Sequence, residues 1–143
     1  MGMKDPVPQF EDVIGKINGL GLAYLHLVKT RIAGNKDVAG ASDEEESLDF
    51  AVRLWDGPLM INGGLKPQGA KDMVDREYKD KDVMAAFGRY YISNPDLPYR
   101  IKEGIELSLY DRATFYTPKK LLGYADQPFS KEFRALYGPQ TLI

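Results

Sequence analysis

Two glycine-bearing segments combine residue types that could bind a phosphate group. Gly63-Gly64 directly follows the expected strand 59–62, and Gly88-Arg89 follows a second expected strand at 83–87. Glycine lets a phosphate approach backbone N–H groups closely, and an arginine at a strand end can hold two of its oxygens. In eightfold β/α barrels the loops after the last two strands commonly bind phosphate in this way. The same residues also fit a tight strand-to-helix turn and an arginine in a surface ion pair, because loose glycine motifs are common.

The other polar residues that could take part in chemistry are better explained by structural roles. His26 is the only histidine and lies within an apolar run, where packing or hydrogen bonding is a commoner role than catalysis. The acidic run 43–46 is interpreted as the solvated start of a helix, and Tyr90 and Tyr91 are expected to pack between a strand and a helix. The chain has no cysteine, so thiolate ligands, thiol nucleophiles and disulfides are excluded. We predict no metal site.

Apolar periodicity predicts helices that alternate with strands. The expected helices lie at 10–20, from the capping residues Ser42 and Asp43 to 55, from 67 onward, and from Ser93-Asn94 to 104; the expected strands lie at 22–28, 59–62 and 83–87. The strands are nearly continuous apolar runs, as in parallel sheets that helices cover. This alternation predicts an α/β fold with a parallel sheet. The segment 30–41 is expected to be a loop, and the chain past 107 is expected to drape over the body.

The composition excludes several classes of function. The 19 basic and 21 acidic residues give a net charge of −2, without the clustered positive charge that nucleic acids or anionic membranes require. No apolar run approaches the roughly 20 residues that span a bilayer, and the first ten residues have no signal-peptide core. Together with the absence of cysteine, these features indicate a reducing, cytoplasmic location.

Four segments resemble, in the correct order, the closing part of the old yellow enzymes. They are YLHLV at 24–28, GPLMINGG at 57–64, FGRYYISNPDL at 87–97 and YDRATFY at 110–116, and Gly123-Tyr124 with Pro128-Phe129 is similar to the family's tail. Members of this family are FMN-dependent ene-reductases that use NADPH and have an eightfold β/α barrel. The sequence is most similar to the fungal branch that acts on chanoclavine aldehyde in ergot alkaloid biosynthesis.

The resemblance implies roles for six residues. The implied FMN-phosphate site consists of Gly63, Gly64, Gly88 and Arg89, and the implied aromatic pair over the flavin and substrate is Phe115 and Tyr116. Some relatives carry asparagine at the position of Gly64, so a side-chain contact made there would be absent. The family's carbonyl-binding pair and proton-donating tyrosine lie upstream of the matched segments. We therefore assign no catalytic residue.

Three strands cannot close a barrel of this kind, which takes about 250 residues. We interpret residues 1–143 as a truncated C-terminal portion of a flavin oxidoreductase barrel, an incomplete TIM (β/α)8 barrel with roughly its last three β/α units and its tail. The expected function is that of an inactive old-yellow-enzyme-type dehydrogenase, because ene reduction needs a positioned flavin and a proton donor. Open strand edges and a bare inner face predict weak stability and self-association.

Two alternative functions remain open. The chain could belong to an active FMN- and NADPH-dependent reductase of enals or enones, such as chanoclavine-I aldehyde, if the rest of the barrel is supplied. It could instead be a non-enzymatic partner that binds a full-length relative through its exposed strand edges. An upstream extension of the reading frame would favour the active reductase. Co-purification with a relative, without a change in bound flavin, would favour the non-enzymatic partner.

Overall fold

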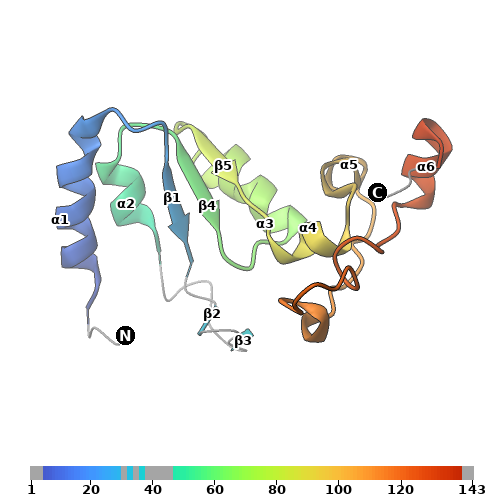
Figure 1. Ribbon diagram of the computed structural model, residues 1–143. Helices are drawn as coiled ribbons and strands as arrows, with labels where there is room; N and C mark the ends of the chain where they lie inside the picture. The colour runs from blue at the N-terminus through green and yellow to red at the C-terminus, as the bar shows by residue number, and fades with distance from the viewer. Residues whose placement is uncertain (1–4, 30–31, 34–35, 38–46, 140–143) are drawn as a thin grey trace. The chain divides into compact units, whose positions relative to one another are not determined.

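The computed structural model describes residues 5–29, 32–33, 36–37 and 47–139 of the chain. The chain divides into two compact units, Met1–Ala86 and Phe87–Ile143. The first unit contains the strands and the helices that alternate with them, and the second contains short helices and the tail (Figure 1).

A three-stranded parallel sheet forms the centre of the first unit (Figure 1). Its strands are β1 (Leu25–Val28), β4 (Leu59–Asn62) and β5 (Val83–Ala85), in the order β1-β4-β5. Leu25 pairs with Leu59, and Leu59 pairs with Val83. Because all three strands run in the same direction, their carboxyl ends lie at one edge of the sheet. The parallel α/β arrangement predicted from the sequence is confirmed, with β1 and β5 shorter than expected.

Helices precede and follow the strands in the predicted order. They are α1 (Val7–Ile17), continued by the turn η1 (Asn18–Leu20); α2 (Asp49–Leu54); and α3 (Pro67–Asp72), continued by η2 (Met73–Glu77). Proline near the start of α1 and of α3 suits a first turn, where its missing N–H has no partner to lose. None of the helices among the described residues has the length and apolar character needed to cross a membrane.

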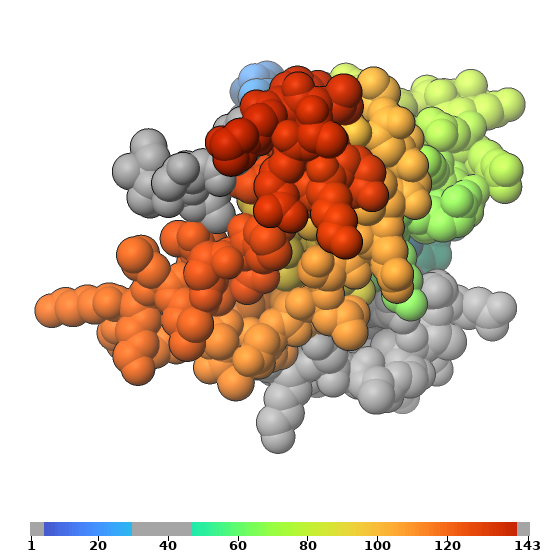
Figure 2. Space-filling model, turned by 90° about the vertical axis from the view of Figure 1, so that its right-hand side faces the viewer, coloured from blue at the N-terminus to red at the C-terminus, as the bar shows by residue number. Residues whose placement is uncertain are grey.

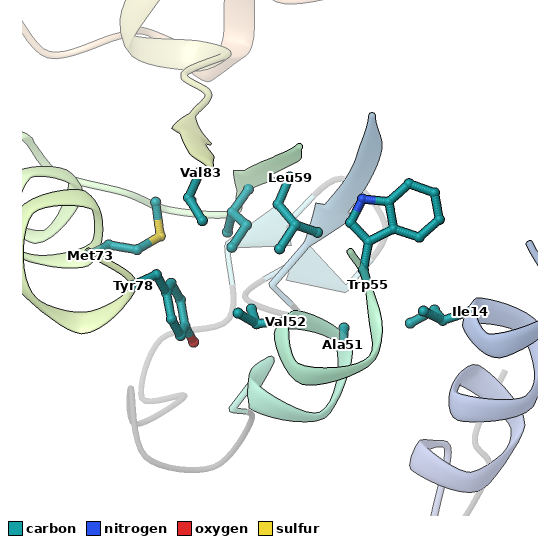
Figure 3. Packing of buried hydrophobic residues seen from close by; sticks show 9 residues of the cluster. Ile14, Ala51, Val52, Trp55, Leu59, Met73, Tyr78 and Val83 are labelled. Atoms are coloured by element: carbon teal, nitrogen blue, oxygen red, sulfur yellow. The ribbon is translucent and has the colours of Figure 1, made fainter. Parts of the chain in front are cut away.

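The core of the first unit lies between these helices and one face of the sheet (Figure 3). Trp55, Leu59 and Ile61 are each at most 1% exposed, and Ile14 of α1 and Met73 of η2 complete the same cluster. The indole Nε1 of Trp55 donates a hydrogen bond to the carbonyl of Pro58 at 2.9 Å. The largest side chain of the core is therefore buried without leaving its polar atom unpaired.

The opposite face of the sheet is not covered by these helices. Side chains alternate along a strand, so His26, Val28, Met60 and Met84 share this face. Val28 is 54% exposed, Met84 is 39% exposed, and His26 is exposed as well. His26 was expected to be packed or hydrogen-bonded; it is exposed, because it lies on edge strand β1 with its side chain on the uncovered face.

The connection between β1 and α2 differs from the predicted loop. Here β2 (Ile32–Ala33) pairs antiparallel with β3 (Lys36–Asp37). The predicted caps Ser42 and Asp43 and the acidic run 43–46 lie outside the described residues. The described helix begins at Asp49, whose N–H donates to the hydroxyl of Ser47 at 3.0 Å.

The second unit is built from short helices and an extended tail. Its helices are α4 (Arg89–Ser93), α5 (Leu97–Glu103), η3 (Arg112–Thr114) and α6 (Lys131–Tyr137). The prediction that Ser93-Asn94 caps a helix is wrong. Both side chains are at most 1% exposed and donate to the carbonyl of Ser108, at 2.9 Å and 3.0 Å. They fasten the tail instead, a role that depends on a partner 14 and 15 residues away.

A buried ion pair joins α5 to the tail. Arg100 Nε donates to Asp96 Oδ1 at 2.8 Å, and the two side chains are 6% and 0% exposed. Arg100 also donates to the carbonyls of Glu106 and Pro128, at 3.2 Å and 3.3 Å. Asp96 Oδ2 accepts hydrogen bonds from the backbone and the hydroxyl of Ser130. One ion pair thus holds both ends of the tail segment 106–130.

Asp96→Asn is expected to destabilise the second unit by about 3–5 kcal/mol, because it leaves the buried Arg100 without its charged partner. Burial raises the pKa of Asp96, but hydrogen bonds from Ser130 and Arg100 outweigh burial and hold the pKa below its ordinary value of 3.8. Because the pKa of Asp96 is lower in the folded state than in the unfolded state, its charge stabilises the unit fully at pH values above the unfolded-state pKa. This contribution is lost as pH falls through the folded pKa.

Urea unfolding, monitored by hydrogen exchange of residues 87–143, is measured at neutral pH and below pH 4. It reports the destabilisation by Asp96→Asn and the loss of stability at low pH. Glu103→Gln is the control, because its pair with Lys102 is 3.8 Å long and solvent-exposed, and such pairs contribute at most about 1 kcal/mol. Equal unfolding of the Asp96→Asn and Glu103→Gln proteins at neutral pH would contradict the role given to the buried pair.

Candidate functional site

Gly63 makes a close backbone approach at the carboxyl end of β4. Its φ is 115°, and a Cβ at this position would lie 2.6 Å from the carbonyl oxygen and 2.7 Å from the backbone nitrogen of Lys29. The Lys29 N–H donates to the carbonyl of Asn62 at 2.9 Å, which draws the two segments together. Only glycine fits here, because any side chain would collide with backbone atoms that cannot move aside.

Gly64 follows with a φ of 71° and is exposed. The chain turns at these two glycines from β4 toward α3, which starts at Pro67. The turn interpretation of Gly63-Gly64 is therefore correct as local geometry. A turn of this kind does not rule out phosphate binding, because backbone N–H groups in glycine turns can also bind anions.

Asn62, the last residue of β4, has a buried side-chain oxygen. Oδ1 has no hydrogen-bond partner among the residues that the structure describes. Leu59 and Ile61 point into the core, so alternation puts Asn62 on the same face as Met60. An unsatisfied buried carbonyl costs about 1–3 kcal/mol. Asn62 and Gly63 are two features of this sheet edge that fit a bound group.

Arg89 is held against an aromatic ring in the second unit. Its Nη1 donates to the hydroxyl of Tyr110 at 3.4 Å, and its guanidinium carbon lies 5.8 Å from the centre of that ring. Tyr110 also contacts Tyr90 edge-on at 5.3 Å and Phe115 at 5.7 Å between ring centres. The exposed Gly88 precedes Arg89 at the start of α4. A cation against a ring face gains electrostatic attraction, which orients the guanidinium.

The aromatic pair Phe115-Tyr116 is fixed by a second tail segment, which belongs to the orange part of the surface in Figure 2. Tyr116 has a φ of 60°, is 76% exposed, and donates its N–H to the hydroxyl of Tyr124 at 3.0 Å. The ring centres of Phe115 and Tyr124 are 6.0 Å apart. A Cβ on Gly123, whose φ is 83°, would collide with the side chain of Thr114. Gly123 and Tyr124 therefore position the pair.

The structure brings some of the predicted site residues together. Within the second unit, Tyr110 connects Arg89 to Phe115, so the predicted phosphate arginine and the predicted aromatic pair share one cluster. Gly63 and Gly64 belong to the first unit, beside Asn62. Sequence reasoning gave no role to Asn62, Tyr110 or Tyr124. All three lie in the segments that carry the resemblance. Their hydrogen-bond partners are 8 or more residues away or, for Asn62 Oδ1, not found among the described residues, and spacing alone gives no signal for such contacts.

The architecture is that of part of a β/α barrel: the strands are parallel, helices cover one face of the sheet, and glycines follow a strand at its carboxyl end. In such barrels ligands bind at that end of the strands. Residues 9–108 match the NADH:flavin oxidoreductase / NADH oxidase family. The match covers well over half of the chain, which therefore belongs to this family.

Solved structures support the same fold. The old yellow enzyme from Pichia sp. AKU4542 is 25% identical with a TM-score of 0.68, and the similarity covers 96% of this chain and 32% of that one. Morphinone reductase in complex with tetrahydroNAD is 27% identical with a TM-score of 0.71, over 92% of this chain and 32% of that one. The predicted fold, an incomplete β/α barrel, is confirmed.

Curated relatives confirm the fungal branch. A chanoclavine-I aldehyde reductase of Penicillium roqueforti (strain FM164) is 48% identical over 136 residues, which are 94% of this chain and 36% of the relative. The probable inactive reductase easA of Epichloe festucae var. lolii is 42% identical over 134 residues, which are 92% of this chain and 35% of the relative. The chain thus spans about a third of the length of these relatives.

Gly63→Ala is expected to destabilise the first unit by more than about 1 kcal/mol, because the new Cβ meets the Lys29 backbone and the left-handed φ disfavours alanine. The control is Gly69→Ala in α3, where nothing lies within 4 Å of the added Cβ and alanine is the better helix former. Thermal unfolding of both variants measures the difference. Equal midpoints would show that position 63 tolerates a side chain.

Tyr124→Phe is expected to release Tyr116 from its left-handed conformation, because it removes the hydroxyl that accepts the Tyr116 N–H. That conformation costs a non-glycine residue about 1–2 kcal/mol, so it depends on such support. Amide hydrogen exchange at Tyr116 should accelerate about three- to tenfold, the effect of losing one hydrogen bond. Tyr91→Phe, at an exposed tyrosine of α4, is the control. Unchanged exchange in the Tyr124→Phe protein would contradict the positioning role.

Proposed function

We propose that residues 1–143 are the carboxyl-terminal portion of an old-yellow-enzyme-type flavin reductase barrel, and that on their own they do not reduce substrate. The observation that carries this proposal is the sheet with helices on one face and exposed Val28 and Met84 on the other. A flavin ring held for hydride transfer needs a site closed around it. Further strands of the barrel would supply that enclosure by packing against the uncovered face.

In this proposal the phosphate of FMN is held by Gly63, Gly64, Gly88 and Arg89. When FMN is bound, its flavin ring supplies the hydride-transfer chemistry. The collision that forbids a Cβ at Gly63 and the guanidinium held against Tyr110 support these roles. The four residues alone bind phosphate weakly, because a phosphate clamp without the ring site gains only part of the binding free energy.

Phe115 and Tyr116 would shape the pocket over the flavin and the substrate. The high exposure of Tyr116, combined with a backbone fixed by Tyr124, supports a contact surface that is ready before a ligand arrives. In the complete barrel the partners would be NADPH and an enal or enone. The location would be cytoplasmic, in line with a chain that lacks cysteine.

The names of two relatives describe an active and an inactive reductase. The Penicillium roqueforti relative is named a chanoclavine-I aldehyde reductase, and the Epichloe festucae relative is named a probable inactive reductase. We propose that the 143-residue chain is inactive, as the name of the Epichloe festucae relative states for that protein. We also propose that its open strand edges favour self-association.

Flavin absorbance after mixing the chain with FMN and desalting tests the proposal. The expected result is a colourless protein that gives no NADPH oxidation, because FMN that is held weakly, through its phosphate alone, is lost on desalting. The full-length Penicillium roqueforti relative, treated in parallel, is the matched control. Retained yellow flavin that NADPH bleaches would contradict the proposed inactivity.

An active reductase is the second candidate, favoured by the 48% identity to the chanoclavine-I aldehyde reductase. It requires the remainder of the barrel, in the same polypeptide or in a partner. Adding the upstream part of that relative to the 143-residue chain should then produce flavin retention and NADPH oxidation with an enal. Co-purification with a full-length relative, without a change in its flavin content, would instead indicate a non-enzymatic partner.

A further inference from the structure

Asn62 ends β4 with a hydrogen-bond acceptor that the described residues do not use. Its side-chain Oδ1 is buried without a partner, whereas the backbone carbonyl of the same residue accepts from the Lys29 N–H at 2.9 Å. Buried polar atoms in folded proteins are nearly always hydrogen-bonded, so an exception calls for a specific cause. A donor from outside the described residues would supply that cause.

The position of Asn62 indicates where such a donor comes from. The residue directly precedes Gly63-Gly64, and it pairs with Val28, which is 54% exposed on the uncovered face. In sheets of parallel strands, ligands bind at the carboxyl ends of the strands. Asn62 thus lies at the ligand-binding edge and on the face that the helices leave open.

The chemistry of an amide oxygen narrows the class of ligand. In the orientation that the structure gives to the Asn62 amide, this oxygen only accepts hydrogen bonds, and the oxygens of a phosphate dianion accept as well, so a phosphate group does not satisfy it. A hydroxyl can. We propose that Asn62 Oδ1 accepts a hydrogen bond from a hydroxyl of a phosphate-bearing polyol whose phosphate lies at Gly63-Gly64. This inference rests on the proposed function, in which that polyol is the ribityl chain of FMN.

Asn62→Leu separates a ligand-binding role from a structural one, because the two roles predict opposite changes in stability. Leucine has nearly the shape of asparagine and removes a polar atom that has no partner, so the ligand-free variant should be no less stable than the wild type. Its affinity for the polyol should fall about three- to tenfold, the effect of one hydrogen bond. If Asn62 had a structural role instead, the Asn62→Leu substitution would lower the stability of the ligand-free protein, and any loss of affinity would result from that loss of stability.

The test is an equilibrium titration of the 143-residue chain, followed by backbone amide resonances, with inorganic phosphate, riboflavin and FMN. The Asn62→Leu variant should bind inorganic phosphate like the wild type, and should bind riboflavin and FMN more weakly by the same factor. Its thermal midpoint, measured at several protein concentrations to account for association, should equal or exceed that of the wild type.

Asn18→Leu is the matched control in the same unit. Asn18 donates to Asp56 at 2.7 Å and accepts from the Asp56 N–H at 3.0 Å, so both ends of its amide are already used. This variant should lose thermal stability, and its affinity for FMN should not change in the folded state.

Each remaining outcome has a defined meaning. Unchanged FMN affinity, or a lowered midpoint, in the Asn62→Leu variant overturns the inference, while phosphate binding by the wild type leaves the proposed phosphate site standing. Equal weakening of phosphate and FMN also overturns it, because the change then acts through the glycine turn. A wild-type chain that binds neither phosphate nor FMN overturns the phosphate site and this inference together.

Discussion

Strand β4 is the element on which the first unit depends. It is hydrogen-bonded on both sides, to β1 and to β5, and its residues Leu59 and Ile61 are completely buried against the helices. Alternation makes one strand serve two purposes, because the side chains between these core residues must lie on the other face. The packing that stabilises the core therefore also sets the direction of Asn62 and the place where Gly63 meets Lys29.

The second unit reaches a similar result with polar contacts instead of a sheet. Its tail has little regular structure, and the ion pair of Asp96 and Arg100 holds the tail at both ends. Ring contacts then connect α6 to α5, through Tyr99, Phe129, Phe133 and Tyr137. The aromatic pair lies on this tail, where Tyr124 accepts the Tyr116 N–H and the ion pair holds the two ends of segment 106–130. The orientation of Phe115 and Tyr116 is thus linked to side chains of another helix.

The sequence predicts the first unit better than the second, for a physical reason. Short apolar runs such as 59–61 are buried on a sheet, and this burial depends on local pattern, so the strands follow from periodicity. Their parallel direction follows from the alternation with helices. Contacts across 14 or more residues leave no periodic signal. Ser93 and Asn94 have the composition of a cap, yet their partner is Ser108. The helix α6 lies within a tail rich in tyrosine, proline and glycine and was not predicted, although its N-cap Ser130 is a local signal.

The candidate site shows the same division. Gly63, Gly64, Gly88 and Arg89 are recognisable because their residue types carry the chemistry, whereas Asn62, Tyr110 and Tyr124 acquire significance only from what surrounds them. Two of these surroundings are locally unfavourable: a buried acceptor at Asn62 that has no donor among the described residues, and a left-handed backbone at Tyr116. Such costs persist where the rest of the fold over-determines them, and they concentrate at ligand sites. Their occurrence at the sheet edge and in the aromatic tail, the segments that resemble the flavin family's site, is independent physical support for placing ligand contacts there.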